Sequence, residues 1–247
     1  MLDHHIISSV GGRSNNQDLA DTFEANGVRG FVVCDGVGGC SFGDVASKTV
    51  CEKFRKPFIE GAGSVEECIE MGVTAAEEAL RALQASVNDP RSHKSTIAAL
   101  IISGDDAYIV HVGDSRVYHF ADGEYLWRTT DHSLAQMLVM TGDIEPEDIR
   151  TCEDRNVLLH AMGSASDTFK YQSTVRKLCG SAYDGFIICS DGFWEYVTGE
   201  RMAYVLNFGM RNIEDFSARD WLNALAAGME PEDGNDNFTA ISVIIKR

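Results

Sequence analysis

The sequence predicts a single domain of the α+β class, covering residues 1–247 and built as a layered sandwich of sheets and helices. Helical patterns occur in pairs that separate runs of strand-like sequence, without the regular β-α alternation of a doubly wound sheet. Hydrophobic residues make up 44% of the 247 positions, which is enough for a large core, and no proline-rich or serine-rich linker divides the chain.

The N-terminal part is predicted to hold strands and a polar loop. Residues 2–10 and 21–25 have strand-like sequence and flank a loop at 11–18 that carries one arginine, Arg13. Residues 31–34 are all apolar, which is typical of a strand buried on both faces.

Two helices are predicted next. Apolar residues recur at helical spacing from Phe42, so the first helix should end near Pro57. Ser64 and Glu67 have the spacing of a capping box, and the apolar stripe behind them predicts a second helix up to Asn88.

The middle of the chain changes to a β-type pattern. Residues 96–103, 107–112 and 116–120 are separated by Gly-Asp pairs, which predicts an antiparallel meander. The Asp-Gly pairs at 122–123 and 184–185 fit plain hairpin turns.

A surface flap and a mixed C-terminal part complete the prediction. Ser133 should cap a short helix ended by Gly142, and the acidic, irregular residues 143–154 predict a flap that contacts substrate. The remaining predicted elements are strands at 169–175 and 186–189, a helix after Thr198, a helix capped by Ser217, and a last strand at 238–245.

Charge and cysteine usage limit the possible partners and compartment. The net charge of −17 argues against nucleic acid or an anionic membrane as partner. No apolar run reaches the roughly 20 residues of a membrane span, and the N-terminus does not resemble a signal peptide. The seven cysteines include no C-x-x-C pair, and four of them lie in apolar sequence: Cys34, Cys68, Cys179 and Cys189. We interpret these four as buried, reduced thiols and expect a cytoplasmic protein.

Three acidic residues stand where predicted strands end or begin. Asp35 follows the apolar run 31–34, Asp191 follows 186–189 through Ser190, and Asp236 precedes the last strand. A carboxylate near a buried strand end is costly unless it is paired or binds a metal. If the three meet, mutual repulsion calls for a divalent cation, and all-oxygen donors favour Mg²⁺ or Mn²⁺ over zinc. Gly36 could add its carbonyl group.

Such a site predicts hydrolytic chemistry. Two cations can share a bridging water, lower its pKa and direct the resulting hydroxide at a phosphorus or carbonyl centre. Arg13 favours phosphorus, because a guanidinium group binds two phosphoryl oxygens at once.

The order of these motifs resembles that of the metal-dependent serine/threonine protein phosphatases of type 2C (the PPM family), in particular its compact bacterial-type members. The resemblance runs from Arg13 to the last strand. It rests on Arg13 with Asn16-Gln17-Asp18, Asp35-Gly36-Val37-Gly38-Gly39, Ser95-Thr96, Gly113-Asp114-Ser115-Arg116, Thr130-Asp131-His132-Ser133, Ser190-Asp191-Gly192 and Asp236-Asn237.

The resemblance implies a four-layer α-β-β-α sandwich with two central antiparallel sheets and two Mn²⁺ or Mg²⁺ ions at one end. By similarity, Asp35 bridges the two ions and Gly36 offers its carbonyl oxygen as a ligand. Asp191 and Asp236 complete the coordination of the first ion. Asp114 and Asp191 would hold a third, weaker ion found in some members, near which Glu195 stands.

The remaining implied roles concern substrate and partners. Arg13 would bind the phosphate, and Asp18 would act beside Arg13 and Asp35 through a water or metal contact. The expected substrate is a protein phosphorylated on serine or threonine, and the expected partner is an opposing serine/threonine kinase.

Three positions depart from the family pattern. Gln17 replaces an acidic residue, Val37 stands where animal relatives carry a histidine proposed as general acid, and His160 replaces an arginine. Two other functions stay open: a catalytically silent phosphoprotein-binding module, and a hydrolase of small phosphate esters.

Overall fold

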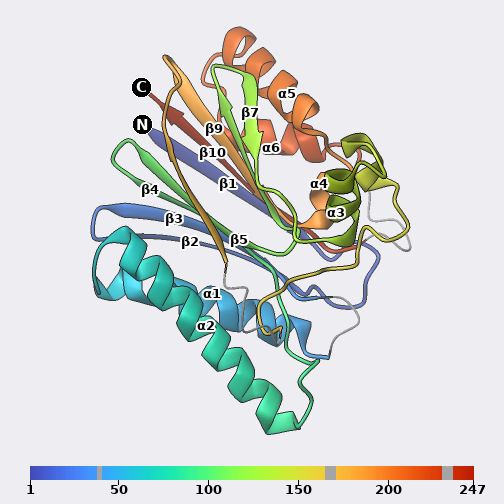
Figure 1. Ribbon diagram of the computed structural model, residues 1–247. Helices are drawn as coiled ribbons and strands as arrows, with labels where there is room; N and C mark the ends of the chain where they lie inside the picture. The colour runs from blue at the N-terminus through green and yellow to red at the C-terminus, as the bar shows by residue number, and fades with distance from the viewer. Residues whose placement is uncertain (38–40, 165–170, 230–235) are drawn as a thin grey trace.

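The computed structural model of the chain describes residues 1–37, 41–164, 171–229 and 236–247, and it is a four-layer α-β-β-α sandwich (Figure 1). The predicted α+β class is therefore confirmed. Two five-stranded sheets lie face to face, and neighbouring strands pair antiparallel in both. Sheet A has the order β1 (Leu2–Ser9), β10 (Phe238–Lys246), β9 (Tyr183–Cys189), β6 (Arg116–Ala121) and β7 (Glu124–Arg128). Sheet B has the order β2 (Asp18–Ala25), β3 (Val28–Asp35), β4 (Ile97–Ser103), β5 (Asp106–Val112) and β8 (Gln172–Lys177).

Helices cover the outer faces of both sheets. The pair α1 (Gly43–Glu60) and α2 (Val65–Val87) lies on sheet B, and the pair α5 (Gly199–Asn212) and α6 (Ala218–Ala226) lies on sheet A (Figure 1). Three short helices lie at one end of the sandwich, namely α3 (Leu134–Thr141), the 3₁₀ helix η1 (Pro146–Arg150) and α4 (Asp191–Trp194). None of the helices in the described ranges is both long and apolar enough to cross a membrane.

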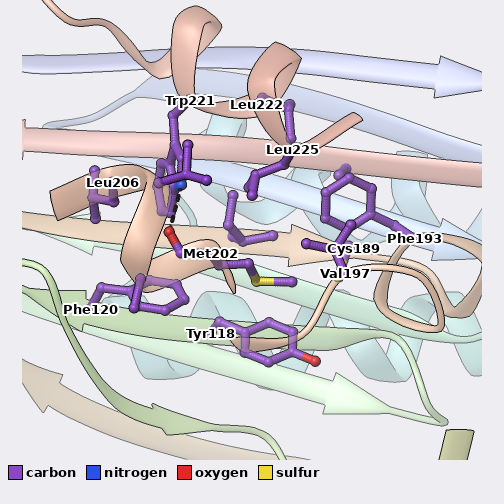
Figure 2. Packing of buried hydrophobic residues seen from close by; sticks show 14 of the residues in the cluster. Tyr118, Phe120, Cys189, Phe193, Val197, Met202, Leu206, Trp221, Leu222 and Leu225 are labelled. Atoms are coloured by element: carbon purple, nitrogen blue, oxygen red, sulfur yellow. Dashed lines mark hydrogen bonds between the residues drawn. The ribbon is translucent and has the colours of Figure 1, made fainter. Parts of the chain in front are cut away.

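The core has three layers of apolar side chains. One lies between the two sheets, one under α1 and α2, and one under α5 and α6. Figure 2 shows the last of these, in which the Trp221 indole N–H donates to the carbonyl oxygen of Met202 at 3.0 Å. The layered core fixes the two sheets against each other, so their strand ends meet at a defined place.

The predicted helix signals are borne out by the structure. The Ser64 hydroxyl accepts from the Glu67 backbone N–H at 3.2 Å, and the Glu67 carboxylate accepts from the Ser64 backbone N–H at 2.7 Å. The side chains of Ser133, Thr198 and Ser217 likewise cap α3, α5 and α6. Capping satisfies N–H groups that the first helical turn leaves without partners.

The predicted meander is wrong at its third strand. β4 and β5 pair in sheet B, but β6 belongs to sheet A, where it pairs with β7 and β9. The chain crosses between the sheets at 113–115, where Gly113 has a φ of 101°. A side chain at Gly113 would also clash with Thr96, so glycine suits this crossing.

The prediction of a plain turn at Asp184–Gly185 is also wrong, because both residues lie inside β9. The buried Asp184 carboxylate pairs with His119 Nε2 at 2.9 Å and accepts from the backbone N–H groups of Cys179 and Gly180, both at 3.1 Å. Burial opposes ionisation of Asp184, but these hydrogen bonds hold its pKa below the usual value. Asp122–Gly123 does form the turn between β6 and β7.

Two further expectations need correction. α1 continues past Pro57 to Glu60 and ends at Gly61, because a proline in the last turn removes one hydrogen bond without stopping the helix. Cys179 is exposed, whereas Cys34, Cys68 and Cys189 are buried as expected; all six described cysteines are free thiols. Phe169, at the start of one predicted strand, lies outside the described residues.

Candidate active site

A cavity of about 370 Å³ lies at the end of the sandwich where strands of both sheets finish. Six of the seven predicted site residues line this cavity: Arg13, Asp35, Gly36, Asp114, Asp191 and Asp236. The seventh, Asp18, is buried beside it. Residues predicted from separate parts of the chain thus come together at one place.

Asp35 and Asp18 meet through strand pairing. The register of β2 and β3 places Asp18 opposite Asp35, which is the last residue of β3. The Asp35 backbone N–H donates to Thr96 Oγ1 at 3.0 Å, and Ser95 Oγ donates to the Asp35 carbonyl oxygen at 2.9 Å. These bonds fix the strand end from which the Asp35 carboxylate enters the cavity.

Asp18 has one satisfied and one unsatisfied oxygen. Oδ2 accepts from Ser190 Oγ at 2.7 Å, whereas Oδ1 is buried and has no hydrogen-bond partner among the described residues. A buried acceptor without a partner costs free energy unless a water or a cation satisfies it.

Gly36 lies where β3 meets the N-terminus of α1. A side chain at this position would clash with the backbone of Gly43. The Gly36 backbone N–H donates to the carbonyl oxygen of Gln17 at 3.1 Å, so strand, loop and helix are in close contact here. Only glycine allows this approach.

Asp191 and Asp236 lie just beyond the ends of two neighbouring strands of sheet A. Asp191 begins α4 directly after β9, and Asp236 precedes β10. Arg13 reaches Asp236 with a paired contact, Nε to Oδ1 at 3.1 Å and Nη2 to Oδ2 at 2.8 Å. The Arg13 side chain is 55% exposed, so solvent weakens this ion pair.

Asp114 reaches the cavity because the chain crosses between the sheets there. Its side chain is buried, and its carbonyl oxygen accepts from the Trp194 indole N–H at 2.9 Å. Glu195, expected near the same place, instead pairs through its carboxylate with Arg155 Nε at 2.8 Å and does not line the cavity.

The electrostatics of the site oppose ionisation of all of its carboxyl groups at once. Burial raises the pKa of Asp18 to about 6 and that of Asp114 to about 7. Burial, followed by repulsion from neighbouring carboxylates, raises the pKa of Asp35 and of Asp191 well above the usual range. A nearby cation would reverse these shifts by favouring the charged forms.

The donor set fits Mg²⁺ or Mn²⁺. Every acidic group at the cavity offers oxygen, the donor that these ions prefer, and the unsatisfied Asp18 oxygen points to a missing partner. The oxygens are spread around the cavity, since within the described ranges no three of these acidic groups bring their oxygens within 4.8 Å of one another.

Asn237 is a site residue whose structural role the sequence did not reveal. Its Nδ2 donates to the carbonyl oxygens of Val10 at 2.8 Å and Asn15 at 3.0 Å, and its Oδ1 accepts from the Gln17 backbone N–H at 2.8 Å. Asn237 therefore holds the loop that carries Arg13. The one hint of this role in the sequence was the position of Asn237 directly after Asp236.

The predicted flap lies next to the cavity, but its boundaries differ. Residues 143–154 contain η1 and contribute no lining residue, whereas Asn156 and Leu158 just beyond them do line the cavity. Sequence composition identified an exposed segment here without showing which of its side chains face the site.

Fold and site together define a sandwich protein with a cavity lined by carboxylate oxygens, which fit a divalent cation, and by one arginine. The chain belongs to the protein phosphatase 2C family, whose profile matches residues 8–226.

Comparison with known proteins agrees with this membership. The serine/threonine protein phosphatase PstP of Mycobacterium tuberculosis is 29% identical over 195 residues, which are 78% of this chain but 36% of PstP. This chain therefore matches about a third of the length of that relative. The serine/threonine phosphatase Stp1 of Staphylococcus aureus has the same fold, with a TM-score of 0.86 and 24% identity over 100% of this chain and 96% of that one. The PstP catalytic domain in complex with 2 manganese ions gives a TM-score of 0.77 and 26% identity over 99% of each chain.

Proposed function

We propose that this protein is a metal-dependent phosphatase that hydrolyses phosphoserine and phosphothreonine in proteins. The observation that carries the proposal is the convergence of four acidic side chains, Asp35, Asp114, Asp191 and Asp236, with Arg13 around one cavity of a type 2C chain. The name of PstP, a serine/threonine protein phosphatase, supports the substrate class.

The acidic residues have the proposed role of metal ligands. Asp35, the carbonyl group of Gly36, Asp191 and Asp236 would hold two Mn²⁺ or Mg²⁺ ions, and Asp114 with Asp191 would hold a third, weaker one. Two manganese ions in the PstP catalytic domain support the first part of this assignment. When bound, the pair of ions would acidify a water for direct attack on phosphorus, which releases the serine or threonine hydroxyl without a covalent enzyme intermediate.

The other residues bind the substrate and hold protons. Arg13 lies at the cavity edge, where its guanidinium group can donate to two phosphoryl oxygens and offset the charge of the transition state. Asp18, whose Oδ1 has no partner among the described residues, would accept a hydrogen bond from a water in the site. A serine/threonine kinase that phosphorylates the same substrates is the proposed partner.

Phosphate release from a phosphothreonine peptide tests the proposal. We expect turnover with Mn²⁺, loss of turnover on chelation, and a decrease of about a hundredfold or more in Asp35→Asn, because a neutral amide removes a bridging ligand. Asp105→Asn, which changes an exposed carboxylate in a distant turn, should retain full activity.

Two outcomes would contradict this assignment. Retained activity in a folded Asp35→Asn protein would remove the metal role of Asp35. No turnover by folded wild-type protein in excess Mn²⁺ would favour the phosphoprotein-binding module, whereas equal turnover of free phosphoserine would favour a small-ester hydrolase.

A further inference from the structure

A second cavity, of about 280 Å³, lies where β6, β7, η1 and the start of α5 meet. It shares no described lining residue with the active cavity. Three arginines line it, Arg116 from β6, Arg128 from β7 and Arg150 from η1. Such a concentration of positive charge is unusual in a chain whose net charge is −17.

Arg116 and Trp194 line the buried part of this cavity. The Arg116 guanidinium carbon lies 3.4 Å from the centre of the Trp194 ring. Its Nε and Nη2 donate to the two carboxylate oxygens of Asp131 at 2.8 and 2.5 Å, and its Nη1 donates to Tyr118 Oη at 3.0 Å. The Arg116 side chain is only 6% exposed, so this cation has a fixed position inside the protein.

The buried negative charge does not balance the three cations. Arg128 also approaches Asp131, with Nη1 at 3.5 Å from Oδ1, so two guanidinium groups share one carboxylate. Arg150 donates to the backbone carbonyl oxygen of Glu195, a neutral group. The two lining glutamates, at 147 and 200, are exposed, so water and salt screen them. The formal charges of the three arginines, Asp131 and the two glutamates cancel, so the excess of positive charge is confined to the less exposed groups.

We propose that this second cavity binds an oxyanion of the phosphate class, either free phosphate or a phosphoryl group on a polypeptide. A dianion matches three guanidinium groups, two of which share one buried carboxylate, better than a monocarboxylate does. Each guanidinium group carries five N–H donors, of which Arg116 uses three in the hydrogen bonds described above.

The position of this site connects it to the active cavity. The Trp194 ring lies under Arg116, and its indole N–H donates to the carbonyl oxygen of Asp114 at 2.9 Å. An anion held by Arg116 and Arg128 would lie in the cavity that Trp194 also lines, next to the side chain that bonds the Asp114 backbone. The site goes beyond the proposed hydrolysis, which does not require it.

Titration of the full chain with inorganic phosphate in excess Mg²⁺ tests the proposal, with the Trp194 indole ¹H–¹⁵N resonance, assigned through Trp194→Phe, as the readout. We expect a saturable shift whose apparent affinity is about tenfold weaker in Arg128→Gln, because a charge-assisted contact is lost. The matched control Arg29→Gln, which removes an exposed arginine paired with Glu24, should leave the affinity unchanged. The shift should persist in Arg13→Ala.

Three results would overturn the proposal. The first is the absence of a saturable shift, and the second is wild-type affinity in folded Arg128→Gln. The third is a shift that is lost in Arg13→Ala but kept in Arg128→Gln, since the phosphate would then occupy the active cavity. If Arg128→Gln does not fold, Arg150→Gln replaces it, and wild-type affinity in that variant would count equally against the site.

A non-hydrolysable phosphonate analogue of a phosphoserine peptide distinguishes the two sources of the oxyanion. Tighter binding of the analogue than of inorganic phosphate would assign the site to a phosphorylated segment of a protein. Binding of inorganic phosphate alone would assign it to free phosphate. Either result is independent of turnover, so failure of the proposed activity would leave this test intact.

Discussion

Arg13 combines two properties that suit a substrate-binding residue. Among the described residues that line the active cavity, Arg13 is the one with a positively charged side chain. Arg13 contacts Asp236 through two hydrogen bonds, but its side chain is 55% exposed. The guanidinium group can therefore exchange Asp236 for another partner at a low cost in free energy. A phosphoryl group offers the same two-oxygen geometry as the Asp236 carboxylate.

Replacement of Arg13 by alanine should therefore weaken substrate binding. We expect KM for a phosphothreonine peptide to rise about tenfold in Arg13→Ala, with a smaller change in kcat, because a charge-assisted contact is lost. Steady-state kinetics with Mn²⁺ measures both constants. Arg91→Ala removes an exposed arginine that does not line the cavity and should behave as wild type. An unchanged KM in Arg13→Ala would exclude the proposed contact.

At the scale of elements, the active end depends on a loop that has no regular structure of its own. The segment between β1 and β2 carries Arg13 and is held to the start of β10 by three hydrogen bonds of the buried Asn237 side chain. Because β10 also follows Asp236, the Asp236-Asn237 pair aligns a proposed metal ligand with the loop that carries Arg13.

Loss of the Asn237 side chain should loosen this loop without unfolding the sandwich. In Asn237→Ala we expect about tenfold lower kcat/KM and faster hydrogen exchange at the Gln17 backbone N–H, which loses its acceptor. Asn212→Ala is the matched control, since its side chain donates within the end of α5, to the Phe208 carbonyl oxygen. Unchanged exchange at Gln17 in Asn237→Ala would show that other contacts hold the loop.

Element prediction succeeded where a local signal decides the structure. The capping box at Ser64 and the caps at Ser133 and Ser217 depend on hydrogen bonds within one helical turn, so sequence alone identified them. No local signal shows that β6 belongs to sheet A, because side chains alternate along a strand in the same way in either sheet. Asp184 was misread for a related reason, since its buried partner His119 lies on another strand.

For the whole molecule, motif order predicted the cavity but not its detailed geometry. Arg13, Asp35, Gly36, Asp114, Asp191 and Asp236 were named from the sequence and all line the active cavity. The role of Asn237 and the charge excess near Arg116 depend on side chains brought together from several elements. Such contacts leave no periodic or compositional pattern in the chain.

The crowding of carboxylates makes the stability of the whole molecule depend on pH and on divalent cations. Burial raises the folded-state pKa of Asp18 to about 6 and of Asp114 to about 7, so the folded chain binds more protons than the unfolded chain between about pH 4 and 7. In EDTA, the free energy of unfolding should therefore fall as pH rises through this range, by about 3 kcal/mol from Asp18 alone. Mg²⁺ or Mn²⁺ should reverse the loss. Urea denaturation at several pH values measures the slope, which Asp18→Asn should flatten and the exposed Asp215→Asn should not. An equal slope in Asp18→Asn would show that general acidic repulsion, rather than the active site, sets this dependence.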